Sequence, residues 1–192
     1  MLGAAPDETD YSTVSADRER GRRIAAAYMA GPVLDDRARP AYHAFAAETA
    51  RQFDLLTAPV RRGGLGVEVR VSSSDPYPDA SSMARDLRRR RLLWVYSTAA
   101  SGSAHPLLSD EENDMFRAVH DAFGHAAIGR AFDADGEEAA WRSHYSMYSP
   151  LAGWAMTTET RGQNCAMLHH FGGRRFPEQK AFLLPPEIAL LF

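Results

Sequence analysis

The chain has 192 residues, of which 45% are hydrophobic and 24% are charged. These values are ordinary for a globular protein, and the length allows one substantial hydrophobic core. The net charge of −3 argues against a general nucleic-acid or anionic-membrane binder, since such proteins usually carry a basic surplus. Cys165 is the only cysteine, which excludes an intrachain disulfide and a thiolate zinc cluster. With neither a signal peptide nor a long apolar run, the sequence predicts a cytoplasmic protein that does not span a membrane.

The first half of the chain predicts two helices and a small sheet. Residues 1–14 are expected to form a flexible N-terminal arm. A helix that starts at Ser15 should end at Gly31-Pro32, and a second helix with one apolar stripe should follow Pro40 and end before Pro59. Residues 67–71 and 92–96 are predicted to be two short strands that pair beside the helices, with a further helix between them.

The second half predicts three helices and an apolar end. The capping box Ser109-Asp-Glu-Glu112 starts a helix, residues 137–148 form the next, and Pro150 opens a third that runs to about residue 170. The apolar residues 188–192 should dock on the body of the protein or on a second subunit, and a homodimer is one arrangement that would bury them. The predicted fold class is mainly α, with residues 15–192 forming a single helical domain that carries a small two-stranded β element.

Two histidines five positions apart, His120 and His125, are the centre of the functional prediction. A regular helix turns about 100° per residue, so these side chains would point roughly 140° apart. Gly124 tolerates unusual backbone angles, so the helix could end, widen or kink there and bring His125 round. Asp121 and His125 have the i,i+4 spacing of co-ligands on an undistorted helix. The two ligand pairs, His120 with His125 and Asp121 with His125, therefore compete.

Glu159 lies in a largely apolar predicted helix. An ionised carboxylate in a core is costly when unpaired, and a metal ion would compensate for that cost; a bridge to another helix is the alternative. Gln163 and Asn164 are candidates for hydrogen bonds that fix the orientation of a ligand. Glu159 with His120 and His125 would complete the two-histidine, one-carboxylate set that holds Fe(II) on one face and leaves the other open.

The segment from His120 to His125, His-Asp-Ala-Phe-Gly-His, resembles the His-Asp-x-Phe-Gly-His signature of the bacterial pterin-dependent aromatic amino acid hydroxylases. The segment from Trp154 to Glu159 is similar to the later Trp/Tyr-rich helix of that family. The resemblance implies His120, His125 and Glu159 as ligands of non-heme iron, with Asp121 beside them. The family's upstream substrate and pterin segments have no counterpart here, so iron is implied more strongly than pterin. From His120 to Asn164 the chain also resembles small bacterial and phage-borne proteins, which implies no activity.

These features predict a mononuclear Fe(II)-dependent oxygenase or hydroxylase that uses O₂ to oxidise a small, potentially aromatic substrate. Asp121 and His144 are the candidate catalytic residues beside the metal ligands. His105, in the loop before the metal helix, is expected to be a plain loop histidine.

Three alternatives stay open. A di-iron oxidase would recruit Asp121, His144 and either Glu137 or Glu138. A zinc hydrolase would activate water with a similar ligand set, although such helices normally carry His-Glu-x-x-His. A non-enzymatic binding or assembly protein would use its histidines structurally.

Overall fold

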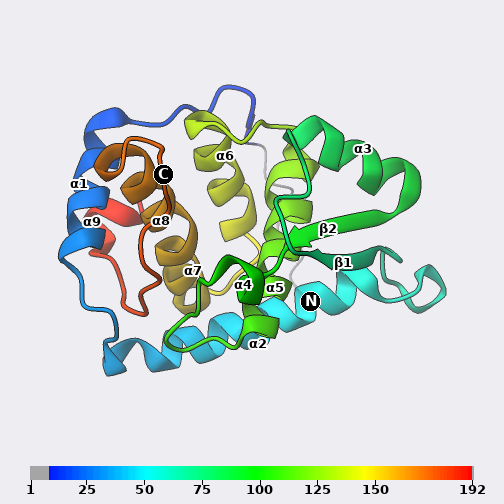
Figure 1. The fold of residues 1–192 in the computed structure, drawn as a ribbon, viewed down its shortest axis with the longest axis horizontal. Helices are drawn as coiled ribbons and strands as arrows, with labels where there is room; N and C mark the ends of the chain where they lie inside the picture. The colour runs from blue at the N-terminus through cyan, green and yellow to red at the C-terminus, as the bar shows by residue number, and fades with distance from the viewer. Residues whose placement is uncertain (1–8, 192) are drawn as a thin grey trace.

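The computed structural model describes residues 9–191, which form a helical body with one small sheet (Figure 1). The predicted fold class is confirmed. Of the predicted flexible arm, residues 1–8 lie outside the described residues. In the remainder, the Arg130 guanidinium donates hydrogen bonds to the backbone carbonyls of Tyr11, Ser12 and Val14. Among the described helices, none is both long enough and apolar enough to cross a bilayer.

The described helices include regular α-helices, single 3₁₀ turns and π-helical segments. In chain order they are α1 (Arg18–Ala30), η1 (Asp36–Ala38), α2 (Arg39–Thr57), η2 (Val60–Arg62), α3 (Ala80–Arg90), α4 (Thr98–Ser101), α5 (Asp110–Val119), η3 (His120–Ala126), α6 (Ala134–Tyr145), α7 (Pro150–Thr157), η4 (Thr158–Gly162), α8 (Gln163–Cys165), η5 (Ala166–His170) and α9 (Pro186–Ala189). The segments η3, η4 and η5 are π-helical.

The sheet consists of β1 (Glu68–Ser72) and β2 (Leu92–Tyr96), which pair in parallel with Glu68 opposite Leu92. Parallel strands cannot be joined by a tight hairpin, and α3 provides the crossover that they need. Figure 1 shows this unit at the opposite end of the molecule from α1. The predicted pairing of the two strands is confirmed, and α5 packs against β2.

The main core lies where α2 packs against α5 and α7. Tyr42, Phe45 and Leu56, from the predicted apolar stripe of α2, are all fully buried. Burial of each such large side chain contributes about 1.5–3 kcal/mol to folding. α2 is therefore the platform on which the helices that carry the histidines are held.

The predicted helix over residues 137–148 starts three residues earlier, as α6. The reason is local: the Asp133 side chain accepts a hydrogen bond from the backbone N–H of Gly136 and caps the helix there. Residues 150–170 form the continuous helical run that was predicted, but α-helical and π-helical turns alternate along it. These turns place Glu159, in η4, and Asn164, in α8.

The apolar C-terminal segment docks on the body of the protein. Ile188 and Ala189 of α9 pack with Ile24 and Tyr28 of α1 in a second, smaller cluster. The prediction of docking is therefore confirmed for the described residues, whereas Phe192 lies outside them. A homodimer stays a prediction.

Candidate metal centre

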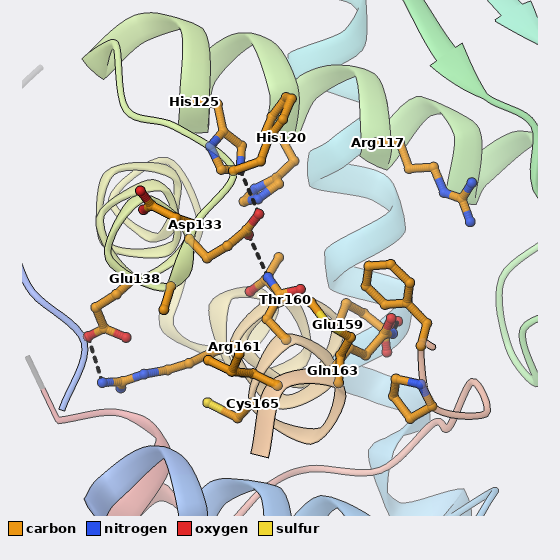
Figure 2. A pocket seen from close by; sticks show the side chains of 18 of the residues that line it. Arg117, His120, His125, Asp133, Glu138, Glu159, Thr160, Arg161, Gln163 and Cys165 are labelled. Carbon is orange, nitrogen blue, oxygen red and sulfur yellow. Dashed lines mark hydrogen bonds and ion pairs between the residues drawn. The ribbon is translucent and has the colours of Figure 1, made fainter. Parts of the chain in front are cut away.

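His120 and His125 lie at the two ends of a widened helical turn. The capping box at Ser109 and Glu112 is present and starts α5 as predicted, and the helix changes to the π form at His120. The hydrogen bonds of a π-helix span five residues, so the two imidazoles come to the same side, with ring centroids 5.2 Å apart. Figure 2 shows both rings pointing from this helix into the same pocket. Of the three distortions that the spacing allowed, an end, a widening or a kink, the structure has the widening.

Gly124 allows this arrangement for a reason other than the predicted one. It does not have the positive φ that distinguishes the turn glycines of this chain. Instead, a Cβ atom at this position would lie 3.2 Å from Cε1 and Nδ1 of the His120 ring and 3.3 Å from the Ala140 Cβ. The glycine therefore makes room for the imidazole and for the close approach of α6.

A third group joins the histidines from α6, which packs against η3. Three ligand atoms, one from each of His120, His125 and Glu137, all lie within 4.8 Å of one another. His125 Nε2 lies 3.5 Å from Glu137 Oε1. Two imidazoles and one carboxylate are a known ligand set for divalent transition metals.

The tautomer of His120 follows from a chain of hydrogen bonds behind it. Gln52 Nε2 donates to the Met147 carbonyl (3.2 Å), so its Oε1 is the atom that faces His144 Nε2 at 2.7 Å. Because an amide oxygen only accepts, His144 Nε2 carries the proton. Burial lowers the pKa of His144 to about 3, so this ring is neutral and its Nδ1 is an acceptor.

His120 Nδ1 lies 3.1 Å from that acceptor and must therefore be protonated. Burial, with the neighbouring imidazoles of His125 and His144, holds the pKa of His120 well below its ordinary value. The ring is neutral, and its Nε2 is left with a free lone pair. Within residues 9–191 this nitrogen is buried and has no hydrogen-bond partner. A metal-binding histidine typically donates its second ring N–H to a hydrogen-bond acceptor, and His120 Nδ1 donates to His144 in this way.

His125 and Glu137 form the other half of the group. Burial alone would lower the pKa of His125, but the hydrogen bond and the charge of Glu137, with the charge of Asp121, raise it above its ordinary value. His125 Nδ1 is also buried without a hydrogen-bond partner in the described part of the chain. Glu137 Oε2 accepts a hydrogen bond of 2.5 Å from Asn164 Nδ2. Asn164 thus orients this carboxylate.

Of the predicted catalytic residues, Asp121 lines the same cavity as His120 and His125, whereas His144 does not line it. Burial raises the pKa of Asp121 to about 7. His144 is fully buried behind His120, so any effect of His144 on chemistry would pass through His120. Glu138, considered for a second metal, is engaged with Arg161 (2.7 Å) and Arg142 (3.1 Å).

Glu159 is not part of the group formed by His120, His125 and Glu137. Its Oε1 lies 2.5 Å from Tyr42 Oη and 3.2 Å from His105 Nε2, and its Oε2 accepts from Gln163 Nε2 at 2.7 Å. Figure 2 shows Glu159 beside Gln163, on a different helix from the two histidines. Glu159 does line the same cavity, and its role as a ligand stays a prediction.

His105 is not the plain loop histidine that was expected. The ring is buried, and its Nδ1 accepts hydrogen bonds from the backbone N–H groups of Leu107 and Leu108. Its Nε2 therefore carries the proton and donates to Glu159. Because Tyr42, His105 and Gln163 all supply donors, they stabilise Glu159 as an anion without a metal.

The cavity in front of these residues has a volume of about 1050 Å³, which is at the upper end of the range for small-molecule sites. His120, His125 and Glu137 are among the residues that line it. No family model, curated protein or solved structure matches this chain. The resemblance to the aromatic amino acid hydroxylases therefore depends on the motif residues alone.

Two residues of this site were missed as parts of a mononuclear centre. The sequence prediction assigns Glu137 only to a di-iron site, and it does not include Gln52. The sequence contains a signal for Glu137, because it is an acidic residue in the first turn of the helix that follows the histidine motif. It contained none for Gln52, which lies 92 residues from its partner His144.

Proposed function

We propose that this chain binds one divalent transition-metal ion through His120, His125 and Glu137, and that with Fe(II) it is an oxygenase for a small substrate. The observation that carries the proposal is the free lone pair of His120 Nε2, buried beside His125 and Glu137. A buried acceptor without a partner costs about 1–3 kcal/mol, and a bound cation would remove that cost.

The donor set favours iron. Two imidazoles and one carboxylate leave coordination positions open, as in non-heme Fe(II) oxygenases, and the histidine motif resembles that of an iron-dependent family. A zinc hydrolase is the weaker alternative, because the His-Glu-x-x-His arrangement is absent from the sequence. When bound, Fe(II) would supply the activation of O₂. The proposal includes no pterin.

The protein's own residues would position the ligands and the substrate. Gln52 and His144 hold His120 in one tautomer, and Asn164 holds Glu137. The cavity offers room for a small molecule directly beside these side chains. With a single cysteine and no possible disulfide, the chain also suits the reducing cytoplasm that we propose as its compartment.

Metal analysis of anaerobically purified and reconstituted protein tests the proposal. We expect about one iron per chain, a ferrous-nitrosyl spectrum, and loss of both in His120→Ala. Glu137→Gln should weaken iron binding strongly, whereas the matched variant Glu159→Gln should retain it. The opposite result for the two glutamates would make Glu159 the third ligand.

Other results would replace the proposal with one of the alternatives. Two irons per chain would indicate a di-iron oxidase. Native zinc, with turnover that does not need O₂, would indicate a hydrolase. No stoichiometric metal in the wild-type chain, together with normal folding of His120→Ala and His125→Ala, would indicate a non-enzymatic binding or assembly protein.

A further inference from the structure

Arg117 lies one helical turn before His120 and lines the same cavity. Figure 2 shows its side chain leaving the helix that also carries His120 and His125. Its Nη1 donates a hydrogen bond of 2.5 Å to the Tyr96 carbonyl. Nε and Nη2 of Arg117 make no hydrogen bond with residues 9–191, and no carboxylate oxygen of those residues lies within 4.0 Å of them. The Tyr96 contact therefore holds the guanidinium and leaves its Nε–Nη2 edge free.

The position of this cation makes the free edge significant. Arg117 is partly buried, and burial lowers its pKa, while Asp114 and Asp121 act on it only through their charge. Asp114 is already used by Thr98, whose backbone N–H and hydroxyl both donate to it at 2.7 Å. A charged group that is partly withdrawn from water and has no oppositely charged partner is costly. An anionic ligand in the cavity would provide that partner.

Asn113 lies one turn before Arg117 and also lines the cavity. The side chain is only 4% exposed, and its Nδ2 has no hydrogen-bond partner in the described part of the chain. Residues four apart on a helix are neighbours on its surface. A second donor that lacks an acceptor therefore lies on the same face of α5 as Arg117.

We propose that Asn113 and Arg117 form a binding site for the carboxylate of a small organic acid, and that this acid is the substrate of the metal centre. The second half of this statement rests on the proposed function, whereas the binding of the acid does not. Because His120 is one turn further along the helix, a ligand held at Arg117 would place its body beside Phe116 and the metal ligands.

A carboxylate fits this site better than a phosphate does. The Nε–Nη2 edge of a guanidinium matches the two oxygens of a carboxylate in a bidentate contact. Arg161, which lines the same cavity, is already paired with Glu138 at 2.7 Å. The cavity is also lined by Asp121 and Glu137, which would repel a dianion more strongly than a monoanion.

Calorimetric titration of the full chain in EDTA tests the site without interference from a metal. The probes are benzoate, its neutral analogue benzamide, and inorganic phosphate. We expect benzoate to bind at least about tenfold more tightly than benzamide or phosphate, because a hydrogen bond to a charged group is stronger than a neutral one. Arg117→Gln should reduce benzoate binding at least tenfold, and Arg117→Lys should restore little of it, since lysine lacks the planar fork.

Arg88→Gln is the matched control. Arg88 also donates to a backbone carbonyl, that of Ala126, but it does not line the cavity. This variant should bind benzoate as the wild type does, and thermal unfolding of each variant checks that it is folded. Equal binding of benzoate and benzamide, no binding of benzoate, stronger binding of phosphate, or normal benzoate binding by folded Arg117→Gln would each overturn the site.

A second measurement addresses the role of the acid as substrate. In protein loaded with Mn²⁺, the ring protons of bound benzoate should relax faster than in the metal-free protein. Failure of the chain to bind a metal would contradict the proposed function and leave the EDTA titration unaffected. Metal binding with no faster relaxation of bound benzoate would instead overturn the assignment of the acid as substrate.

Discussion

His144 Nδ1 lies 3.1 Å from His120 Nδ1, at the end of a hydrogen-bond chain that begins at the Met147 carbonyl. Gln52, His144 and His120 are all buried. Because a carbonyl can only accept, the direction of every proton in the chain is determined, and the remaining nitrogen of His120 keeps its lone pair. Gln52 and His144, which are not metal ligands in the proposed site, should therefore control its metal affinity.

Gln52→Leu tests this chain. The variant removes the acceptor for His144 Nε2, so the His144 proton can move to Nδ1. His120 Nδ1 then no longer faces a defined acceptor. We expect the affinity for Fe(II) or Zn²⁺ to fall about tenfold to hundredfold, the range typical of residues that orient metal ligands. Competition with a chromophoric chelator measures the affinity.

Gln179→Leu is the control for that experiment. Gln179 also pairs with a buried polar side chain, that of Gln163 at 2.8 Å, but it belongs to the Glu159 network. Its substitution should leave metal affinity within about twofold of the wild type, a change of under about 0.5 kcal/mol. If both variants lost affinity equally, a general loss of packing would explain the result better than the tautomer does.

Gly124→Ala should weaken the metal site by displacing His120. The new Cβ would lie 3.2 Å from the His120 ring, which is closer than ordinary contact. Since Phe116 and His144 pack around that ring, it cannot easily move. We expect a loss of about 1–3 kcal/mol in the free energy of unfolding and a reduced metal affinity, measured by chemical denaturation with and without Zn²⁺. Increased stability with unchanged affinity would show that the ring has room to shift.

Tyr42→Phe should destabilise the protein without affecting metal binding. The Tyr42 hydroxyl is 2.5 Å from Glu159 Oε1, and both groups are buried. Loss of one donor to a buried carboxylate should cost about 1–3 kcal/mol. Urea denaturation measures the stability, and the chelator competition measures the metal. A loss of metal affinity larger than that of Glu137→Gln would indicate that Glu159 belongs to the metal site after all.

Cys165 should be unreactive in the folded protein. Burial raises the pKa of its thiol to about 12; the charge of Arg161 lowers the pKa in part, and the charge of Glu138 raises it. Since the thiolate is the reactive form, alkylation by iodoacetamide at pH 8 should be at least roughly hundredfold slower in the folded protein than in urea. In urea the rate should level off near pH 9, whereas in the folded chain it should still be rising at pH 10.

The same shift has a consequence for stability. The unfolded chain loses the thiol proton from about pH 9 upward, while the folded chain keeps it to about pH 12. The unfolded state therefore binds fewer protons in this window, and the free energy of unfolding should decrease as the pH rises through it. Cys165→Ala should have a smaller decrease between pH 8.5 and 10.5. An identical decrease in both proteins would contradict the assignment to this thiol.

Local features of the sequence determined much of the fold. The capping box at Ser109, Pro150 at the start of α7 and the apolar stripe of α2 each act within one or two helical turns, so they predicted the helices that the structure contains. The spacing of His120 and His125 around Gly124 likewise allowed for an end, a widening or a kink of the helix at this point, because helical geometry relates side chains only a few residues apart.

The partners of the carboxylates were decided by the tertiary structure. Glu159 is separated along the chain from Tyr42 by 117 residues and from His105 by 54, and only packing brings them together. Once these donors surround Glu159, the acid that reaches the histidines is Glu137, because α6 packs directly against η3. Sequence spacing along a helix specifies which side chains share a face, whereas the packing of distant helices specifies what that face meets.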